Sequence, residues 1–298
     1  MNNRMVKGRG HSLKITGKYL VLIIFGLFFL FPIVYMIMSS LKPDFQLLQD
    51  STSLRAFLPV GDISLDNYIG AFKHIPMLSF LTNSILVTSV TVLLGLLVNS
   101  LAAYSIAILR WRGRGFVLSI VIATLIIPLE TIVIPMLLLV SRLPWLDLNG
   151  FHIGWFSSYH VQIIPFIANA FSIFLFVQFF KSLPFELVEA ARVDGANWFQ
   201  TYTKVIMPLS GPVIATVTIL TFLPMWNQYL WPTMVIQEEA YRPVMVGLQY
   251  FFQQTIGGHT PWGEVMAYLS TITIPVLVLF LALQKAFVES IATTGIKG

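Results

Sequence analysis

The chain of 298 residues contains no cysteine and carries little charge. The absence of cysteine excludes disulfide bonds, thiolate zinc sites and catalysis by a thiol. Charged residues make up 10% of the chain, whereas soluble domains carry about 25%. Hydrophobic residues make up 56%, and the mean hydropathy is +0.80. This composition predicts an integral membrane protein that consists mostly of membrane-spanning segments.

Motifs of several other functions are also missing. There is no Gly-x-x-x-x-Gly-Lys-Ser/Thr phosphate loop, because the Gly17-Lys18 pair has neither the upstream glycine nor the hydroxyl residue. We therefore expect no ATP hydrolysis by this chain, no bound cofactor and no clustered catalytic residues. No two histidines have metal-ligand spacing on one helix face, which predicts no metal site. The histidines are His11, His74, His152, His160 and His259.

Six apolar segments are long enough to cross a membrane, since a spanning helix needs about 20 mainly apolar residues. They run roughly over Tyr19–Met38, Leu78–Leu101, Phe116–Val140, Val161–Phe180, Val213–Trp231 and Val265–Leu283. The first segment is longer than the ~7–15-residue apolar core of a signal peptide, which favours a retained anchor. The predicted fold class is thus all-α, a polytopic protein with six transmembrane helices. Residues 41–77 are expected to form an extramembrane loop, and a shorter loop holds Pro144, Asp147 and Asn149.

The basic residues predict the orientation of these spans. A pI of about 9.4 is compatible with nucleic-acid binding, but the basic residues gather at the membrane edges and form no stripe, so no nucleic-acid partner is expected. One side of the predicted membrane carries thirteen of them, and these are Arg4, Lys7, Arg9, Lys14, Lys18, Arg110, Arg112, Arg114, Lys181, Arg192, Lys204, Lys285 and Lys297. The other side carries five, which are Lys42, Arg55, Lys73, Arg142 and Arg242. The excess predicts that both termini are cytoplasmic.

A polar island between the fourth and fifth spans, residues 182–208, predicts two short helices joined by a turn. Ser182 is expected to cap the first helix, with Pro184 in its first turn. Gly195 suits a left-handed residue at the end of that helix. Asn197 is expected to cap the second helix, which should end before Pro208.

The first of these helices carries the sequence Glu189-Ala190-Ala191-Arg192. Glu189 and Arg192 are three residues apart and are expected to pair on the helix surface. The small side chains of Ala190 and Ala191 make one side of the helix thin, so that another protein could approach closely. An ordinary amphipathic connector is the alternative interpretation of the helix by itself.

The spacing of the island resembles the cytoplasmic Glu-Ala-Ala loop of ABC importer permeases. The match consists of Glu189-Ala190-Ala191, three residues, Gly195, nine residues, and Val205-x-Met207-Pro208, with Val205 and Met207 as apolar replacements within the family pattern. The resemblance implies that Glu189, Ala190, Ala191, Asp194 and Gly195 couple the chain to a separate ATPase. In this interpretation Glu189 is a polar anchor of the coupling helix, and Gly195 permits the sharp turn.

Several further segments are similar to the carbohydrate branch of these importers, the maltose-type permeases. They are Ser39-Ser40-Leu41-Lys42-Pro43, Leu65-Asp66-Asn67-Tyr68, Leu81-Thr82-Asn83-Ser84, Arg192-Val193-Asp194-Gly195-Ala196, Trp226-Asn227-Gln228-Tyr229 and Lys297-Gly298. The resemblance covers about residues 15–298. It implies a type I importer permease with a cytoplasmic segment at 1–18 and a transmembrane domain at 19–298 that contains the coupling loop.

The same resemblance implies the partners of the chain. These are a second permease, usually non-identical, two ATPase subunits that hold ATP and magnesium, an extracytoplasmic solute-binding protein, and the lipid of a bacterial or archaeal plasma membrane. The implied function is the pore subunit of an ATP-driven sugar importer. A permease for another solute, such as an osmolyte or a polyol phosphate, is one alternative. A secondary transporter is another, although we find no paired repeats with interrupted helices.

Two groups within the spans are candidates for the solute path. Glu130 lies in an apolar span between Pro128 and Pro135, where a carboxylate is a functional candidate by default. Its alternative role is a structural hydrogen bond to a neighbouring helix. Trp226, Asn227, Gln228 and Tyr229 offer aromatic faces and amide groups that suit sugars; an interfacial aromatic belt is the alternative for the aromatic pair.

Overall fold

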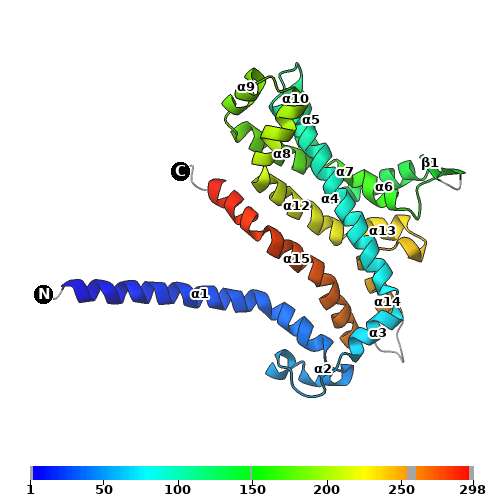
Figure 1. The fold of residues 1–298 in the computed structure, drawn as a ribbon. Helices are drawn as coiled ribbons and strands as arrows, with labels where there is room; N and C mark the ends of the chain where they lie inside the picture. The colour runs from blue at the N-terminus through cyan, green and yellow to red at the C-terminus, as the bar shows by residue number, and fades with distance from the viewer. Residues whose placement is uncertain (1–2, 148–149, 254–259, 295–298) are drawn as a thin grey trace. The chain divides into compact units, whose positions relative to one another are not determined.

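The computed structural model describes residues 3–147, 150–253 and 260–294 of a mainly helical protein (Figure 1). The α-helices are α1 (Asn3–Ser40), α2 (Asp44–Asp50), α3 (Asp66–His74), α4 (Met77–Ala107), α5 (Arg114–Thr124), α6 (Leu129–Val140), α7 (Tyr159–Ile167), α8 (Ala170–Ser182), α9 (Glu186–Val193), α10 (Trp198–Thr201), α11 (Met207–Leu209), α12 (Gly211–Trp226), α13 (Leu230–Val235), α14 (Val244–Gln253) and α15 (Trp262–Thr294). Shorter helical segments are η1 (Leu54–Phe57), the π-turn η2 (Tyr202–Ile206) and η3 (Glu239–Tyr241). The predicted helical class is confirmed, with one addition described below.

The chain forms two compact units. The first is built from Met1–Ile75 and Tyr250–Thr273, and the second from Pro76–Gln249 and Ile274–Gly298. The first unit contains α1 to α3, and the second contains the elements from α4 to α13, including the polar island.

Three helical segments are long and apolar enough to cross a membrane, and these are Ile15–Ser40, Met77–Ala107 and Trp262–Lys285. Three further candidates are pairs of helices with a bend between them. The bend is 102° between α5 and α6, 41° between α7 and α8, and 80° between the α10–α11 segment and α12. Counting each bent pair as one crossing gives six crossings in the described part of the chain, in agreement with the predicted number.

The third predicted span, Phe116–Val140, is wrong as a single straight helix. α5 ends at Thr124, and α6 begins at Leu129 after the 102° bend. Pro128 causes the interruption, because it has no backbone N–H and disfavours helical geometry in the residue before it. The intervening residues form tight turns instead, such as Ile127 N to Thr124 O at 3.2 Å. The fifth predicted span, Val213–Trp231, is likewise interrupted between α12 and α13.

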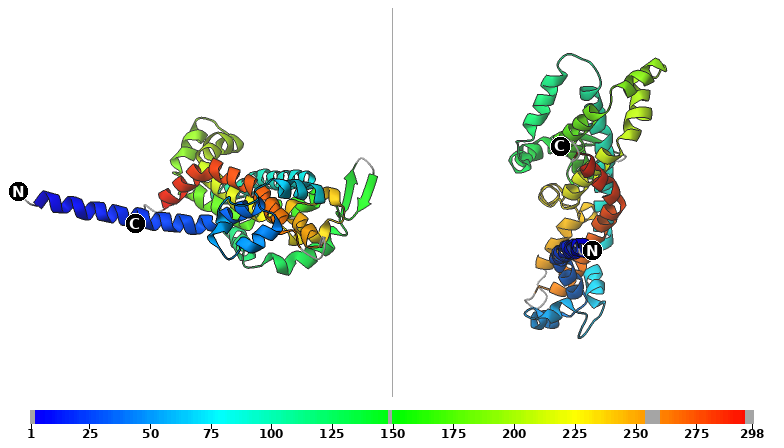
Figure 2. Two further views of the ribbon diagram at one scale, coloured as in Figure 1. Left: turned by 90° about the horizontal axis from the view of Figure 1, so that it is seen from below. Right: turned by 90° about the vertical axis from the view of Figure 1, so that its left-hand side faces the viewer.

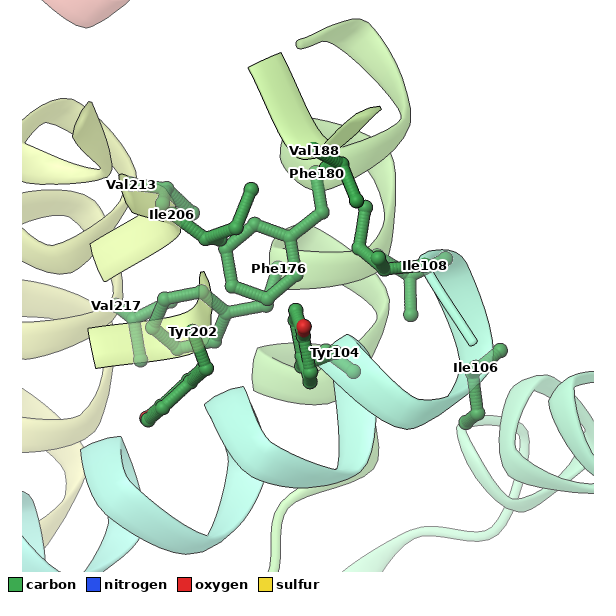
Figure 3. Close-up of a cluster of buried hydrophobic side chains, with 12 residues drawn as sticks. Tyr104, Ile106, Ile108, Phe176, Phe180, Val188, Tyr202, Ile206, Val213 and Val217 are labelled. Atoms are coloured by element: carbon green, nitrogen blue, oxygen red, sulfur yellow. The ribbon is translucent and has the colours of Figure 1, made fainter. Parts of the chain in front are cut away.

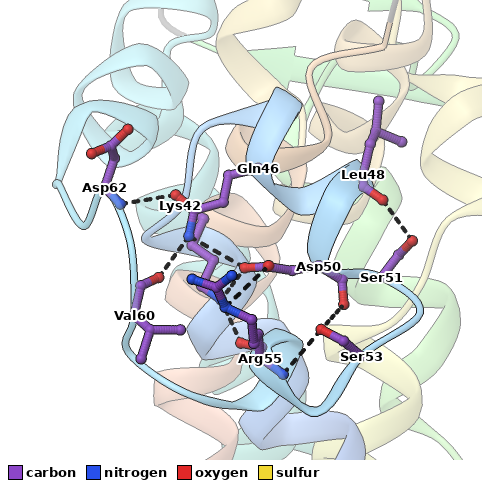
Figure 4. Close-up of polar contacts among 9 residues, drawn as sticks. All are labelled: Lys42, Gln46, Leu48, Asp50, Ser51, Ser53, Arg55, Val60 and Asp62. Carbon is purple, nitrogen blue, oxygen red and sulfur yellow. Dashed lines mark hydrogen bonds and ion pairs between the residues drawn. The ribbon is translucent and has the colours of Figure 1, made fainter.

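The predicted loop 41–77 is folded around a buried lysine (Figure 4). Lys42 is 0% exposed, and its ammonium donates to Asp50 Oδ2 at 2.9 Å and to the Arg55 carbonyl at 2.6 Å. Gln46 donates to the same carboxylate oxygen at 3.3 Å and to the Val60 carbonyl at 2.6 Å. The hydrogen bond from Lys42 holds the pKa of the Asp50 carboxyl below its usual value. We call Lys42, Gln46, Asp50 and Arg55 the Lys42 cluster.

Two of the short sequence motifs meet beside this cluster. The Asn67 amide donates to the carbonyls of Ser40 and Lys42 at 3.0 and 2.8 Å. The hydroxyls of Ser40 and Tyr68 are 2.8 Å apart. The motif at 39–43 therefore ends α1, and the motif at 65–68 holds that end in place from α3.

In the second unit, α4 packs against α7, α8 and α12. The addition to the all-helical prediction lies between α6 and α7, where β1 (Pro144–Asp147) and β2 (Gly150–Ile153) form an antiparallel hairpin with Trp145 opposite His152. Figure 2 shows the hairpin as two paired arrows. Pro144 and Asp147 of the predicted loop thus lie in a strand, and Asn149 lies outside the described residues.

Candidate coupling surface and solute path

The polar island folds as two short helical segments, as predicted, but the first one starts differently. Ser182 is the last residue of α8 and donates its hydroxyl to the Phe179 carbonyl at 2.7 Å, so it does not cap the next helix. α9 begins at Glu186, with Phe185 as the residue before it, and Pro184 lies ahead of the first turn. The Pro184 and Phe185 carbonyls accept the first backbone bonds of α9 from Leu187 and Val188. The prediction for Ser182 fails because its hydroxyl is used within the preceding helix.

α9 has one buried face and one exposed face. Val188 is 2% exposed and Ala191 9%, and both face the protein interior. Glu189 and Ala190 are exposed, and Val193 is 87% exposed. The expectation that Ala190 and Ala191 form one thin accessible side is therefore wrong for Ala191, since residues one apart on a helix point about 100° apart.

The end of α9 is a Schellman turn around Gly195. The Ala196 N–H donates to the Ala191 carbonyl at 2.9 Å, and the Gly195 N–H donates to the Arg192 carbonyl at 3.1 Å. Gly195 has φ +82°, as predicted. Arg192 does not pair with Glu189 as expected; its guanidinium donates to the Ala196 carbonyl at 2.5 Å and lies 4.5 Å from the centroid of the Trp198 ring. The left-handed turn brings Ala196 and Trp198 back within reach, so these contacts replace the surface ion pair.

The second segment begins at Asn197, as predicted. Asn197 Oδ1 accepts from the Gln200 N–H at 2.8 Å, and Gln200 Oε1 accepts from the Asn197 N–H at 2.8 Å, a capping box. The helix does not stop before Pro208, however. The chain widens into the π-turn η2 and continues through Pro208 in α11. The extra residue of a π-turn relaxes the regular backbone pattern into which a proline ring would otherwise clash.

Residues of the island pack into an apolar core together with residues of neighbouring helices (Figure 3). Its buried members are Ala103, Tyr104, Ile106, Ile108, Phe176, Val177, Phe180, Val188, Tyr202, Ile206, Val213 and Val217. They come from α4, α8, α9, η2 and α12. Val188 thus joins α9 to the same buried cluster as residues of the other elements.

Two hydrogen bonds fix the second segment to α4. The Tyr104 hydroxyl donates to the Trp198 carbonyl at 3.0 Å. The hydroxyls of Ser100 and Tyr202 are 2.8 Å apart, and the rings of Tyr104 and Tyr202 lie 5.3 Å apart. The residue pattern of α4 gave no sign of these two roles, because they depend on contacts about a hundred positions apart in sequence.

Glu130 lies at the break in the third span. It is exposed and is the second residue of α6, two positions after the extended Pro128. Within the described part of the chain its carboxylate has no hydrogen bond to a neighbouring helix. The alternative interpretation of Glu130, a structural hydrogen bond between helices, therefore finds no support in these residues. A carboxylate at this end of a helix is favoured by the helix dipole.

The four residues 226–229 do not share one surface. Trp226 is 2% exposed and stacks on Phe222 with centroids 5.5 Å apart. The Asn227 amide donates to the Leu223 carbonyl of its own helix at 2.9 Å. Gln228 is half-buried, and the Tyr229 hydroxyl accepts from the Gln249 amide. The break in the helix thus separates a core tryptophan from the three more accessible residues.

A set of polar side chains that sequence reasoning did not single out fixes the segment after α13. Asn83 donates to the carbonyls of Ala240 and Arg242 at 2.7 and 3.0 Å, and Ser84 accepts from the Val244 N–H at 2.7 Å. The motif at 81–84 was the available signal. Its partners lie about 160 residues away, and the sequence does not reveal them.

Three helices long and apolar enough to cross a membrane, together with three bent helix pairs, indicate a polytopic membrane protein. Residues 92–293 match the family described as "Binding-protein-dependent transport system inner membrane component". This match covers more than half of the chain, so the protein belongs to that family of ABC transporter permeases.

The chain is similar to named relatives over most of its length. It is 30% identical over 273 residues to the arabinooligosaccharides transport system permease protein AraQ of Halalkalibacterium halodurans, covering 90% of this chain and 91% of the relative. It is 35% identical over 194 residues to the sn-glycerol-3-phosphate transport system permease protein UgpE of Salmonella typhimurium, covering 65% of each. Among solved structures, a chain of a bacterial ABC transporter involved in the import of the acidic polysaccharide alginate matches with a TM-score of 0.76 and 26% identity, covering 94% of this chain and 98% of that one.

Proposed function

We propose that this chain is the permease subunit of an ATP-driven importer of oligosaccharides. The similarity to an arabinooligosaccharide permease and to a chain of an alginate importer supports a carbohydrate as the solute. The single observation that carries the proposal is the coupling surface, an exposed short helix on a rigid core inside a family of transport permeases.

The coupling surface is the set of exposed residues Leu187, Glu189, Ala190, Val193 and Asp194. Leu187 is 39% exposed and Val193 87%. Exposed apolar side chains next to charged ones match the apolar core and polar rim of protein–protein interfaces. We propose that a separate ATPase subunit, which holds ATP and magnesium, binds this surface. Gly195 sets the direction in which the chain leaves it.

The remaining partners follow from the same proposal. A second permease completes the pore, two ATPase subunits bind the cytoplasmic side, and a solute-binding protein delivers the sugar from outside. The excess of basic residues on the side of α9 supports a cytoplasmic position for α9 and for both termini, including residues 1–18. The membrane is then the plasma membrane of a bacterium or archaeon.

The orientation is tested with single cysteines, since the native chain has none. Thr52 and Glu186 are both exposed and are suitable positions. In intact cells a membrane-impermeant maleimide should label Thr52→Cys, and it should label Glu186→Cys only after the membrane is opened. Labelling of Glu186→Cys in intact cells would contradict both the orientation and the coupling role.

The function is tested by reconstitution in vesicles. The complex of this chain with its partners should take up an oligosaccharide only when ATP and the binding protein are present, whereas the isolated chain should hydrolyse no ATP. Glu189→Ala should weaken the binding of the ATPase and lower uptake several-fold, with normal insertion in the membrane. Uptake that persists without ATP would favour the secondary transporter.

For the solute path we propose Glu130, Asn227, Gln228 and Tyr229, with Trp226 as the buried support of the pair of amides. Asn227→Ala and Gln228→Ala should change the apparent affinity or the range of sugars accepted, because amides donate and accept as sugar hydroxyls do. Both should leave assembly and basal ATPase activity intact. Glu130→Gln separates a role in transport from a structural one, because loss of a negative charge that faces the path should change uptake without lowering stability.

A polyol phosphate is the second candidate solute, favoured by the similarity to a glycerol-3-phosphate permease. Competition distinguishes the two. An excess of sn-glycerol 3-phosphate should leave oligosaccharide uptake unchanged if the first proposal holds, and should abolish uptake if the phosphate ester is the solute.

A further inference from the structure

A cavity lined by polar and aromatic side chains lies in the unit that contains α4 to α13. It has a volume of about 780 Å³ and is formed by the β1–β2 hairpin, the start of α7 and the segment after α13. We call it the hairpin pocket, and its polar and aromatic members are Trp145, His152, Tyr159, His160, Glu238 and Tyr241. Small-molecule sites have volumes of about 300–1,000 Å³, so the pocket is large enough for a short oligosaccharide. None of these residues belongs to the coupling surface or the solute path proposed above.

One wall of the pocket is aromatic and fixed. Trp145 stacks on His160 with centroids 3.7 Å apart and planes 16° from parallel. Trp155 meets the same imidazole edge-on at 5.0 Å, and its indole N–H donates to the Pro144 carbonyl at 3.1 Å, which ties the segment after β2 to β1. Trp145 is nevertheless 36% exposed, so part of its indole surface is accessible in the pocket.

A second part of the pocket lining is held by Ser157, a residue with a strained backbone. Ser157 has φ +51°, the only described non-glycine residue with positive φ. Its hydroxyl accepts from the backbone N–H groups of Gln237 and Glu238 at 3.0 and 3.1 Å, and its own N–H donates to the Val235 carbonyl at 2.9 Å. A strained backbone conformation of this kind persists only where surrounding contacts hold it in place, and such residues are common at functional sites. Here it fixes the backbone that carries Glu238.

Tyr241 is positioned by its neighbours as well. Its ring meets Tyr159 edge-on at 5.0 Å, and its carbonyl accepts from the buried Gln162 amide at 3.0 Å. The Tyr159 hydroxyl donates to Asn83 Oδ1 at 2.8 Å. Both walls of the pocket are therefore preorganised, which lowers the cost of ordering them when a ligand binds.

We infer that the hairpin pocket is a carbohydrate subsite of the permease, separate from the path through the spans. The inference rests on the proposed function for the identity of the solute class. Aromatic surface suits the C–H faces of a sugar ring. The Glu238 carboxylate accepts hydrogen bonds, and the two imidazoles both donate and accept, as sugar hydroxyls require. An organic cation such as choline would need only acceptors and aromatic faces. Because the two imidazoles also offer hydrogen-bond donors, the lining favours a sugar over a cation.

Direct binding is measured by saturation-transfer NMR on the importer complex in nanodiscs, without its binding protein, with maltotriose and arabinotriose as probes and choline as the cation control. The wild type should transfer saturation to the C–H protons of at least one trisaccharide. Trp145→Ala should raise its dissociation constant about tenfold, the effect of one aromatic contact. Glu238→Gln keeps the shape of an exposed side chain and should raise it by a smaller factor, which guards against misfolding as the cause.

Trp111→Ala is the matched control, since Trp111 is 39% exposed and lies on the proposed cytoplasmic side. It should bind the sugar as the wild type does. The inference is overturned if neither trisaccharide binds the wild type, if Trp145→Ala binds as tightly as Trp111→Ala, or if choline binds and the sugars do not.

Uptake by the complete importer separates the subsite from the proposed function. If the function holds, the wild type takes up a trisaccharide, and Trp145→Ala should need about tenfold more sugar-loaded binding protein for half-maximal uptake. Equal requirements in both variants would contradict the subsite and leave the function standing. Sugar binding in the NMR experiment without any uptake would contradict the proposed function and leave the subsite standing.

Discussion

The Lys42 cluster and the coupling surface differ in what they bury: the cluster buries a charged side chain, and the coupling surface exposes an apolar one. In the cluster, Lys42 is 0% exposed, and its ammonium donates to the Asp50 carboxylate and to the Arg55 carbonyl. On the coupling surface, Val193 is 87% exposed although it is apolar. The charged group of the cluster has its partners within this chain, whereas the coupling surface leaves an apolar side chain uncovered, as we expect of a surface that binds another protein.

The difference predicts where mutations act. Buried polar groups that are fully paired specify one local structure, and loss of one partner leaves the other group unsatisfied. Exposed apolar groups contribute little to the stability of the chain that carries them, and their burial contributes to binding instead. Mutations in the cluster should lower stability first, and mutations on the coupling surface should lower transport first.

The largest effect on stability is expected from Lys42→Met. The variant keeps most of the apolar stem but leaves Asp50 without its closest cation, and it leaves the Arg55 carbonyl with the Leu58 N–H as its donor in place of two donors. We expect the midpoint of thermal unfolding in detergent to fall by about 5–10 °C, as for a broken buried pair. Lys73→Met, at an exposed lysine of α3, is the control and should unfold within ~1 °C of the wild type. Equal midpoints for the two variants would show that the cluster contributes no special stability.

Gly195→Val should have the largest effect on coupling. A Cβ at this position meets nothing within 4 Å, so the cost is entirely the positive φ of +82°. A β-branched residue is poorly tolerated there, at a cost of about 1–3 kcal/mol that the local turn must absorb. Uptake should fall more than tenfold while the chain still inserts. Gly195→Asn should recover much of the activity, because asparagine adopts this conformation more readily. Wild-type uptake by the valine variant would remove Gly195 from the coupling mechanism.

The sequence predicts the turn at the coupling surface better than it predicts the partners of buried polar residues. Gly195 and the Asn197 cap are local features, and their roles follow from a few adjacent residues. The partners of Lys42 lie 8 and 13 residues away, and those of Asn83 lie 76, 157 and 159 residues away. Contacts at such separations depend on the completed fold, so the motifs at 39–43 and 81–84 were visible while their roles were not.

The broken spans show the same limit. Pro128 was visible within the third apolar segment, and it lacks the N–H that a regular helix needs there. Whether a proline bends a helix slightly or separates two helices by 102° depends on what packs on either side. The burial of Trp226 against Phe222 is a similar case, because four consecutive polar or aromatic residues do not show which one faces the core.

Val193→Ser tests the prediction that mutations on the coupling surface affect binding more than stability. The substitution removes an exposed apolar side chain and should change the unfolding midpoint by less than ~1 °C, because surface changes are usually within about 0.5 kcal/mol. Affinity for the ATPase, measured by titrating the purified ATPase onto nanodiscs that contain the permease, should fall by about three- to tenfold. Val188→Ala is the contrasting variant, since Val188 is 2% exposed and should lower stability instead. A destabilised serine variant with unchanged affinity would reverse the assignment of the two faces of α9.

The smallest effect concerns pH and the Lys42 cluster. The hydrogen bond from Lys42 lowers the folded pKa of Asp50 from its ordinary value of 3.8. A carboxyl with a depressed folded pKa contributes stability that is fully present above the unfolded pKa and is lost as the pH falls through the folded pKa. The unfolding midpoint of the wild type should therefore be steady above pH ~5 and should decline below pH ~4 more steeply than that of Asp50→Asn, which cannot titrate at this position. Asp62→Asn, at an exposed carboxylate of the same loop, should follow the wild-type curve. If Asp50→Asn declines as steeply as the wild type, the acid sensitivity arises from other carboxylates and the ion pair with Lys42 makes no distinct contribution to it.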